Sequence, residues 1–291
     1  MIGYVKKFVK DVAEFYAKNG RGHLPWRKTR DPYKILVSEV MLQQTQVERV
    51  LVKYKEFIDL FPTAQDLARA TLPQVLSAWQ GLGYNRRGKF LHEAGKIIAR
   101  DGFQKDSQAQ KLPGVGPYTQ AAVSTFAFNK PEVFIETNIR TVFTHHFFTP
   151  RSQPEKGRDE RDPNSLFQDG SARVSDNELL PLIEQALAEA HKQKIESRDW
   201  YAALMDYGSY LKRSGVRINS ASKHYSKQSK FEGSNRQLRA GILRELLKKP
   251  LTFTEILKLT KRTKEETERE LSNLQKEGLV VKQKTRYSVA G

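Results

Sequence analysis

The sequence predicts a mainly α-helical protein that ends in a smaller unit of three helices and a β-hairpin. Through residues 1–212, apolar side chains recur at three- and four-residue spacing, and Gly, Pro or Asn separates these runs. Few segments alternate polar and apolar residues with the period of two that a half-buried strand requires. Residues 235–291 resume the helical pattern after a basic stretch and then change to two short strand patterns.

The first 212 residues divide into predicted helices and one long loop. Each helix is a run with helical spacing that Gly, Pro, Asn or polar residues bound on both sides. Residues 150–175 are polar and rich in helix-breaking residues, so we expect a loop insertion there. The predicted helices span residues 4–18, 33–57, 64–70, 73–80, 86–100, 117–127, 137–147, 176–191 and 197–212.

Two further parts follow the predicted core at 1–212. Residues 213–234 are a basic, Ser-rich connector, and residues 235–291 are a predicted winged-helix-like domain. Its helical segments are RQLRAGILRELLKK, TFTEILKLT and TKEETERELSNLQKEG, and its strand segments are LVVKQ and RYSV. Three helices followed by a hairpin are the pattern of a winged helix.

The composition indicates a polyanion as the partner. The chain has 291 residues, enough for about two domains, and carries a formal net charge of +17. A surface this basic attracts nucleic acid first and an anionic membrane second. No apolar run approaches the roughly 20 residues that span a bilayer, and the N-terminus has no signal-peptide core. We therefore expect a cytoplasmic protein that binds no membrane.

The positive charge is concentrated around the connector. Residues 212–249 hold 11 Lys or Arg and two Glu, so about half of the net charge lies in roughly an eighth of the chain. A solvated linker would not require Lys and Arg so consistently, and contact with phosphate explains them better.

The segment KLPGVGPYTQ, residues 111–120, predicts an anion site. Gly114 and Gly116 allow backbone N–H groups to approach another molecule closely. The helix that follows adds free N–H donors and the positive end of its dipole, and phosphate is the usual anion at such a place. The alternative is an ordinary tight connection between two helices.

Two glutamates are candidates for a general acid and for a carboxylate that stabilises a cation. Glu39 lies among apolar residues of a predicted helix, where loss of hydration would raise its pKa toward that of a general acid, unless it simply points to solvent. Glu136 follows an apolar run and precedes a helix that Thr137 or Asn138 would cap. Two carboxylates in one cleft suit glycosidic bond cleavage, because one protonates the leaving group and the other stabilises the sugar cation.

Several short segments match one known family. They are LPWR, DPYK, SEVMLQQTQV, GLGY at 81–84, LPGVGPYT at 112–119, ETN at 136–138 and LMDYG at 204–208. On these segments the chain resembles the helix-hairpin-helix DNA glycosylases and, within them, the MutY family of adenine glycosylases. SEVMLQQTQV is the specific match, whereas LPGVG marks only the superfamily. The resemblance covers about 190 residues and implies a two-lobed helical core.

The resemblance implies roles for individual residues. Glu39 matches the acid that protonates the adenine leaving group, and Glu136 matches an aspartate that stabilises the sugar cation, here one methylene longer. Tyr118 stands where bifunctional relatives carry a catalytic lysine; without that amine no Schiff base forms, so strand cleavage is not expected. Tyr118 and Asn138 would orient the two carboxylates.

The other implied residues contact the extruded base or the DNA. Extrusion is needed because the duplex shields the scissile bond, and a wedge fills the space left behind. The base pocket comprises Leu24, Trp26, Arg27 and Asp206, the wedge comprises Gln44 and Tyr84, and the phosphate contacts of the hairpin and connector comprise Gly114, Val115, Gly116, Thr119, Lys212, Arg213, Arg217 and Lys223.

Two departures from the family bear on cofactor and substrate. Relatives usually carry four cysteines spaced C-x6-C-x2-C-x5-C after the segment that matches LMDYG; this chain has no cysteine, and the spacing falls on Lys212, Asn219, Ser222 and Gln228. We therefore predict no iron–sulfur cluster and no other cofactor. The family's usual domain for reading 8-oxoguanine is not recognisable, and the winged-helix-like domain stands in its place.

The predicted activity is that of a monofunctional glycosylase that acts as a monomer on double-stranded DNA with a mispair or lesion. Adenine opposite 8-oxoguanine or guanine is the first candidate substrate, and thymine or uracil opposite guanine is the alternative. A different class, a non-catalytic winged-helix DNA-binding protein, would not require a carboxylate such as Glu39 in an apolar helix.

Overall fold

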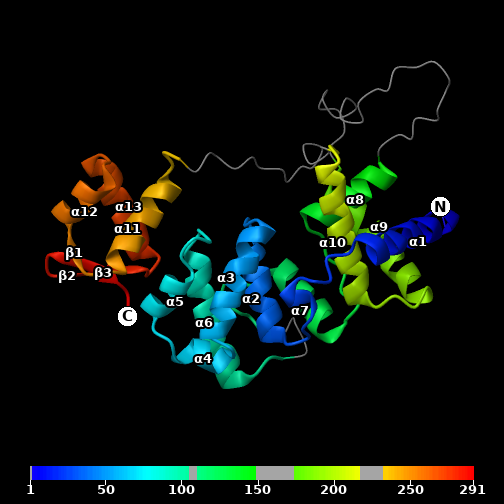
Figure 1. Cartoon of the computed structure of the whole chain (residues 1–291), viewed down its shortest axis with the longest axis horizontal. Coiled ribbons are helices and arrows are strands. Elements are labelled where there is room, and N and C mark those ends of the chain that lie inside the picture. Colours follow the sequence, from blue (N-terminus) through cyan, green and yellow to red (C-terminus); the bar gives the residue numbers. More distant parts are fainter. Residues whose placement is uncertain (1, 105–109, 149–173, 217–231) are drawn as a thin grey trace, which may run out of the picture. The chain divides into compact units, whose positions relative to one another are not determined.

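A computed structural model describes residues 2–104, 110–148, 174–216 and 232–291, and these residues are mainly helical. The helices of the predicted core are α1 (Ile2–Asn19), the 3₁₀ helix η1 (Pro25–Arg27), α2 (Pro32–Leu42), α3 (Val47–Leu60), α4 (Ala64–Arg69), α5 (Leu72–Ala78), α6 (Arg86–Asp101), α7 (Pro117–Phe128), α8 (Thr137–Phe147), α9 (Asp176–Lys192) and α10 (Ser197–Arg213) (Figure 1). Within the described ranges, no helix is both long and apolar enough to cross a membrane.

Local sequence signals set several of the helix starts. In α5, α12 (Phe253–Thr260) and α13 (Lys264–Lys276), a threonine side chain accepts a hydrogen bond from the third helical N–H, while a Gln or Glu at that position bonds back to the threonine N–H. Such capping boxes satisfy two donors that the first turn leaves without partners. The sequence marks them as Thr-x-x-Gln or Thr-x-x-Glu, which explains why these boundaries agree with the predicted ones.

The chain forms two compact units. The first comprises Met1–Arg30 and Gln120–Lys227, and the second comprises Asp31–Thr119 and Gln228–Gly291. The predicted core at 1–212 is therefore divided between both units, and the predicted C-terminal domain belongs to the second one. The periodicity of a helix shows which face is apolar but not which distant helix covers it, so this division is visible only in the structure.

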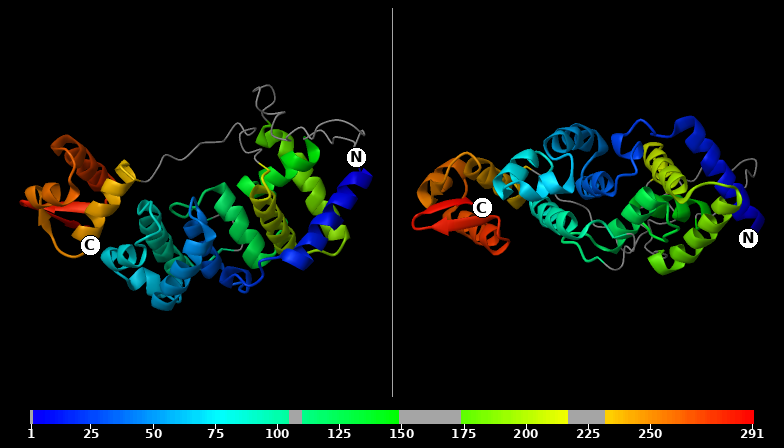
Figure 2. Two further views of the ribbon diagram at one scale, coloured as in Figure 1. Left: turned by 45° about the horizontal axis from the view of Figure 1, so that its top comes forward. Right: turned by 90° about the horizontal axis from the view of Figure 1, so that it is seen from below.

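The first unit is a helical cluster around aromatic side chains. Helices α1, α8, α9 and α10 pack against one another and lie side by side in every view (Figure 2). Phe8 of α1 contacts Phe143 of α8 and Trp200 of α10, with ring centroids 5.4 and 6.0 Å apart. All three rings are fully buried, so they tie the first helix of the chain to helices more than a hundred residues away.

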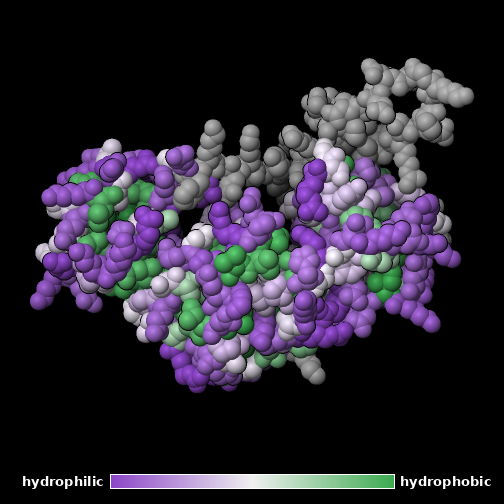
Figure 3. Space-filling view, viewed as in Figure 1, coloured by the Kyte–Doolittle hydropathy of each residue, from purple (hydrophilic) through white to green (hydrophobic). Residues whose placement is uncertain are grey.

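The second unit contains α2 to α6, with α4 and α5 packed on α6 and α2 packed on α3. The molecular face in Figure 3 is mostly hydrophilic, with hydrophobic side chains gathered over α2 and α3. The predicted single helix at 33–57 is wrong, because α2 ends at Leu42 and α3 begins at Val47. The chain turns at Gln44, whose φ of 55° lies in the left-handed region that ends helices.

The C-terminal part of the second unit contains α11 (Asn235–Leu246), α12, α13 and a three-stranded antiparallel sheet. Its strands are β1 (Leu251–Thr252), β2 (Val280–Gln283) and β3 (Arg286–Val289), in the order β1-β3-β2. The sequence analysis missed β1, because two residues are too short to show alternation. The elements thus follow one another as α11, β1, α12, α13, β2 and β3, and the winged-helix assignment stays a prediction.

The apolar core of the C-terminal part also includes two residues from the main helical part of the second unit. Leu72 and Leu76 of α5 are buried together with Leu238, Leu271 and other side chains of the C-terminal part. Lys89 of α6 also donates a hydrogen bond to the Glu277 carbonyl oxygen at 2.7 Å. The C-terminal part is therefore packed against the helices that carry the candidate site.

Candidate active site

Helix α2 places Glu39 among buried apolar side chains. The helix begins at Pro32, where the Asp31 carboxylate accepts a hydrogen bond from the Tyr33 N–H at 2.9 Å. Glu39 is only 7% exposed, which excludes the alternative that it points to solvent. The Tyr118 hydroxyl donates a hydrogen bond to Glu39 Oε2 at 3.0 Å, so the two side chains are in contact, and the role of Tyr118 in the reaction stays a prediction.

Arg87 organises the loops around Glu39, and the sequence analysis missed it. Its Nη1 donates to the carbonyl oxygens of Val40, Met41 and Gln43 at 2.7, 3.1 and 2.6 Å. Its Nη2 donates to the Leu82 carbonyl oxygen at 3.0 Å. Burial lowers the pKa of Arg87 to about 10, a value at which it remains cationic at neutral pH.

This arginine therefore fixes the two loops that carry the predicted wedge residues. Gln44 and Tyr84 are both exposed and both have a left-handed backbone, with φ of 55° and 46°. They line one cavity of about 530 Å³ together with Arg87 and Gly114. The structure thus brings the predicted wedge and part of the predicted phosphate hairpin to one place in the second unit.

We expect replacement of Arg87 by Met to lower the free energy of unfolding by about 3 kcal/mol or more, because several carbonyl groups lose a charged donor. Chemical denaturation of the full chain measures this loss. Arg49→Met removes an exposed cation from α3 and serves as the control, with an expected change within about 0.5 kcal/mol. Equal stability of Arg87→Met and the wild type would show that the loops do not depend on Arg87.

The hairpin before α7 has the geometry that its glycines predict. Gly114 has a φ of 72°, and a Cβ there would lie 2.8 Å from Phe90 Cβ, so both conformation and packing require glycine. A Cβ at Gly116 would meet nothing within 4 Å, which leaves open space for a bound group. Thr119 is buried and accepts a hydrogen bond from Gln43 Nε2 at 3.3 Å, so a phosphate contact at Thr119 would use its backbone N–H.

Glu136 lies in the first unit, at the start of α8. Its Oε1 accepts hydrogen bonds from the N–H groups of Asn138 and Ile139 at 2.7 and 2.9 Å. The expectation that Thr137 or Asn138 caps this helix is therefore wrong, because Glu136 itself is the cap. Asn138 Nδ2 also donates to Glu136 Oε2 at 3.1 Å. The Glu136 carboxylate thus lies at the N-terminus of α8, and Asn138 contacts both of its oxygens, while the role of Asn138 in the reaction stays a prediction.

The predicted base-pocket residues lie together in the first unit. Leu24 is the N-cap of η1, and Trp26 and Arg27 lie within it. All three are largely buried, and Arg27 Nη2 lies 3.6 Å from Asp206 Oδ1. Asp206 is 2% exposed and accepts hydrogen bonds from the backbone N–H and Nε of Arg21 at 2.7 and 2.8 Å. Arg21 was missed by the sequence analysis, although it lies just ahead of the LPWR segment.

One side-chain nitrogen of Arg27, Nη1, is a buried donor without a partner among the described residues. The Arg27 guanidinium lies 5.4 Å from the Phe126 ring centroid. Buried donors are normally satisfied, so a buried donor without a partner marks a place where an acceptor on a bound molecule is expected.

The basic connector is only partly described. Arg213 is exposed at the end of α10, whereas Lys212 is partly buried and donates a hydrogen bond to Asn138 Oδ1 at 2.8 Å. Arg217 and Lys223 lie outside the described residues, as do Asn219, Ser222 and Gln228 and most of the predicted insertion at 150–175.

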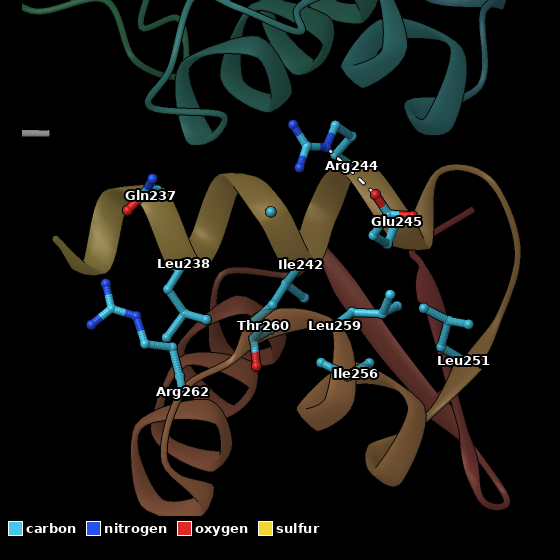
Figure 4. A pocket seen from close by; sticks show the side chains of 11 residues that line it. Gln237, Leu238, Ile242, Arg244, Glu245, Leu251, Ile256, Leu259, Thr260 and Arg262 are labelled. Carbon is cyan, nitrogen blue, oxygen red and sulfur yellow. Dashed lines mark ion pairs between the residues drawn. The ribbon is translucent and has the colours of Figure 1, made fainter. Parts of the chain in front are cut away.

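A second cavity, of about 260 Å³, lies in the C-terminal part between α11 and α12. Leu238 and Ile242 point from α11 toward Ile256 and Leu259 of α12 (Figure 4). Polar and charged side chains, among them Arg244, Glu245 and Arg262, also line it, so its walls are mixed, and no residue of the candidate site is among them. We assign this cavity no function.

Comparison with known proteins shows a family similarity over part of the chain and a shared fold. Residues 37–162 match the family described as the HhH-GPD superfamily of base excision DNA repair proteins. A solved structure of a thermostable thymine-DNA glycosylase has the same fold, with a TM-score of 0.56 at 24% identity over 77% of this chain and 97% of the other. A trapped endonuclease III–DNA covalent intermediate has a TM-score of 0.50 at 15% identity, covering 75% and 88% of the two chains. Part of the chain is thus similar in sequence to this superfamily, and its fold is that of the two solved structures.

Curated proteins that are similar in sequence to about half of this chain are adenine DNA glycosylases. The enzyme of Buchnera aphidicola (subsp. Baizongia pistaciae) is 36% identical over 48% of this chain and 41% of its own length. That of Mycobacterium tuberculosis is 38% identical over 54% of each chain, and that of Homo sapiens is 39% identical over 46% of this chain and 28% of its own. The chain thus spans about half or less of the length of these relatives.

Proposed function

We propose that the chain is a monofunctional DNA glycosylase that removes a mispaired base from double-stranded DNA, with adenine opposite 8-oxoguanine or guanine as the first substrate. The observation that carries this proposal is the buried Glu39 carboxyl group with the Tyr118 hydroxyl 3.0 Å away. In the same unit, Gln44, Tyr84 and the Gly114 hairpin line one cavity. The choice of adenine rests on the curated relatives.

In this proposal the two glutamates divide the reaction between them. Glu39 transfers a proton to the leaving base, so that the base departs as a neutral molecule. The Glu136 carboxylate stabilises the positive charge that develops on the sugar, and water then completes the hydrolysis. Because Tyr118 offers a hydroxyl and no amine, the enzyme forms no Schiff base at that position and does not cleave the strand.

The experiment that tests the proposal is base release from a panel of duplexes. The panel contains adenine opposite 8-oxoguanine, adenine opposite guanine, and thymine or uracil opposite guanine, each heated with and without alkali. Alkali-dependent strand breaks at adenine are expected. Breaks only at thymine or uracil would reassign the substrate, breaks without alkali would show lyase activity, and no breaks would leave a DNA-binding protein.

We also propose that the chain works without an iron–sulfur cluster. The sequence contains no cysteine, so no thiolate ligands for iron exist. Among the described residues there is likewise no group of three or more His, Asp or Glu side chains placed to hold a metal ion. Metal analysis of active protein is expected to find no stoichiometric iron, and chelators should leave base release unchanged. Stoichiometric iron together with chelator-sensitive activity would contradict this.

The C-terminal part is expected to act as a DNA clamp. Two of its basic side chains differ in their contacts: Arg239 is paired with Glu270 and Glu277, whereas the Arg236 guanidinium lies 5.9 Å from the Tyr84 ring centroid. Arg239 thus forms ion pairs within the C-terminal part, whereas Arg236 lies beside Tyr84, a residue of the predicted wedge.

Ending the chain after residue 234 should weaken duplex affinity and flatten its salt dependence, because fewer phosphate contacts release fewer counterions. The truncated variant also carries Leu72→Ser and Leu76→Ser, because removal of the C-terminal part would expose these two apolar side chains to water. The truncated variant should still release base at saturating enzyme. The control is the full-length chain that carries both Leu72→Ser and Leu76→Ser. An unchanged affinity and salt slope would exclude the clamp, and a selective loss of discrimination for the opposite base would assign lesion reading to this part.

A further inference from the structure

Lys212 is directed toward Asn138, the residue that contacts Glu136, rather than toward solvent. It lies in the last turn of α10, where it is partly buried, and its Nζ donates a hydrogen bond to Asn138 Oδ1 at 2.8 Å. Burial lowers the pKa of Lys212, while the charge of Glu136 acts in the opposite direction and that of Arg140 adds to the lowering. The amine is thus in the electrostatic environment of Glu136.

Asn138 connects this amine to Glu136. Its side-chain Nδ2 donates to Glu136 Oε2 at 3.1 Å, and its backbone N–H donates to Glu136 Oε1 at 2.7 Å. The ammonium can only donate and an ionised carboxylate can only accept. The Asn138 amide therefore has one favourable orientation, with its oxygen toward Lys212 and its nitrogen toward Glu136.

The packing of α10 against α8 places Lys212 at this amide. Gly208 lies one helical turn before Lys212, on the same face of α10. A Cβ at Gly208 would lie 2.3 Å from the Asn138 carbonyl oxygen, so the two helices touch backbone to backbone there. The position of Lys212 thus follows from the contact between two helices and is not that of a freely rotating surface side chain.

We propose that Lys212 is a positioning residue for the reaction: its ammonium group holds the Asn138 amide, which in turn holds the Glu136 carboxylate in the orientation that stabilises the sugar cation. This inference rests on the proposed function. It also changes the role expected from the sequence, because a lysine engaged with Asn138 is not a phosphate contact.

Lys212→Met keeps most of the length of the side chain and removes its charge and its donors. We expect it to slow base release at saturating enzyme by roughly 10- to 100-fold, the loss that displacement of a reacting group by about 1 Å can cause. Affinity for a duplex with a non-cleavable adenine analogue should change by less than about threefold, with an unchanged salt slope. Lys212→Arg keeps a cationic donor and should recover much of the rate. Lys192→Met, an exposed lysine at the end of α9, should behave like the wild type.

A double-variant cycle separates this role from a merely structural one. In an Asn138→Ala background, Lys212→Met should cause little further loss of rate, because the two residues act through one chain of hydrogen bonds. Independent losses that add would overturn the proposal, as would a Lys212→Met variant with the wild-type rate. A normal rate at saturation with weaker binding and a flatter salt slope would show a phosphate contact instead. If the wild type releases no base from any duplex, the proposed function fails and this inference falls with it.

Discussion

Replacing Glu39 by Gln is expected to reduce base release by about 10²- to 10⁴-fold, the usual contribution of a general acid. Gln has nearly the shape of Glu and its amide oxygen can still accept a hydrogen bond from the Tyr118 hydroxyl. It has no proton that it can transfer to a leaving base. The packing of α2 should therefore persist, while the chemical step is lost.

Single-turnover base release and duplex affinity must both be measured for this variant. Affinity should stay within a few-fold of the wild type, because Glu39 is buried and makes no phosphate contact in the proposal. Glu48→Gln makes the same change at an exposed position of α3 and should be fully active. If Glu39→Gln released base at a rate comparable to the wild type, the acid role would be wrong.

The second large effect is expected at Glu136. Glu136→Gln removes the charge that would stabilise the sugar cation, and the loss of such a group typically slows a reaction by about 10²- to 10³-fold. Glu136→Asp keeps the charge and is a preferred helix cap, so it should retain much of the activity and most of the stability of α8.

Because Glu136 also caps α8, stability has to be measured beside the rate. Glu178→Gln is the matched control, since Glu178 accepts a hydrogen bond from the Ser175 N–H at the start of α9 and has no proposed catalytic role. Both Gln variants should lose about 1 kcal/mol or less of stability, whereas only Glu136→Gln should lose activity. A wild-type rate for Glu136→Gln would leave the cap as its only function.

The local features of this protein could be predicted from its sequence. Most helices follow from spacing and caps that a window of a few residues contains, such as the Thr71 capping box of α5. Glu39 could be identified as unusual because its neighbours in the helix are apolar, and the absence of cysteine from the sequence is the basis for predicting no iron–sulfur cluster. The glycine turn before α7 was likewise visible, because φ at Gly114 is set locally.

Only the tertiary structure decided which charged side chains support the site. Arg87 bonds to carbonyl groups more than 40 residues away, and Lys212 reaches Asn138 across 74 positions of the chain. A long cationic side chain has the same sequence signature whether it points to solvent or to a buried acceptor. Its direction depends on which helices touch, and that is set by the apolar surfaces that the whole chain buries together, such as Leu76 against the C-terminal core.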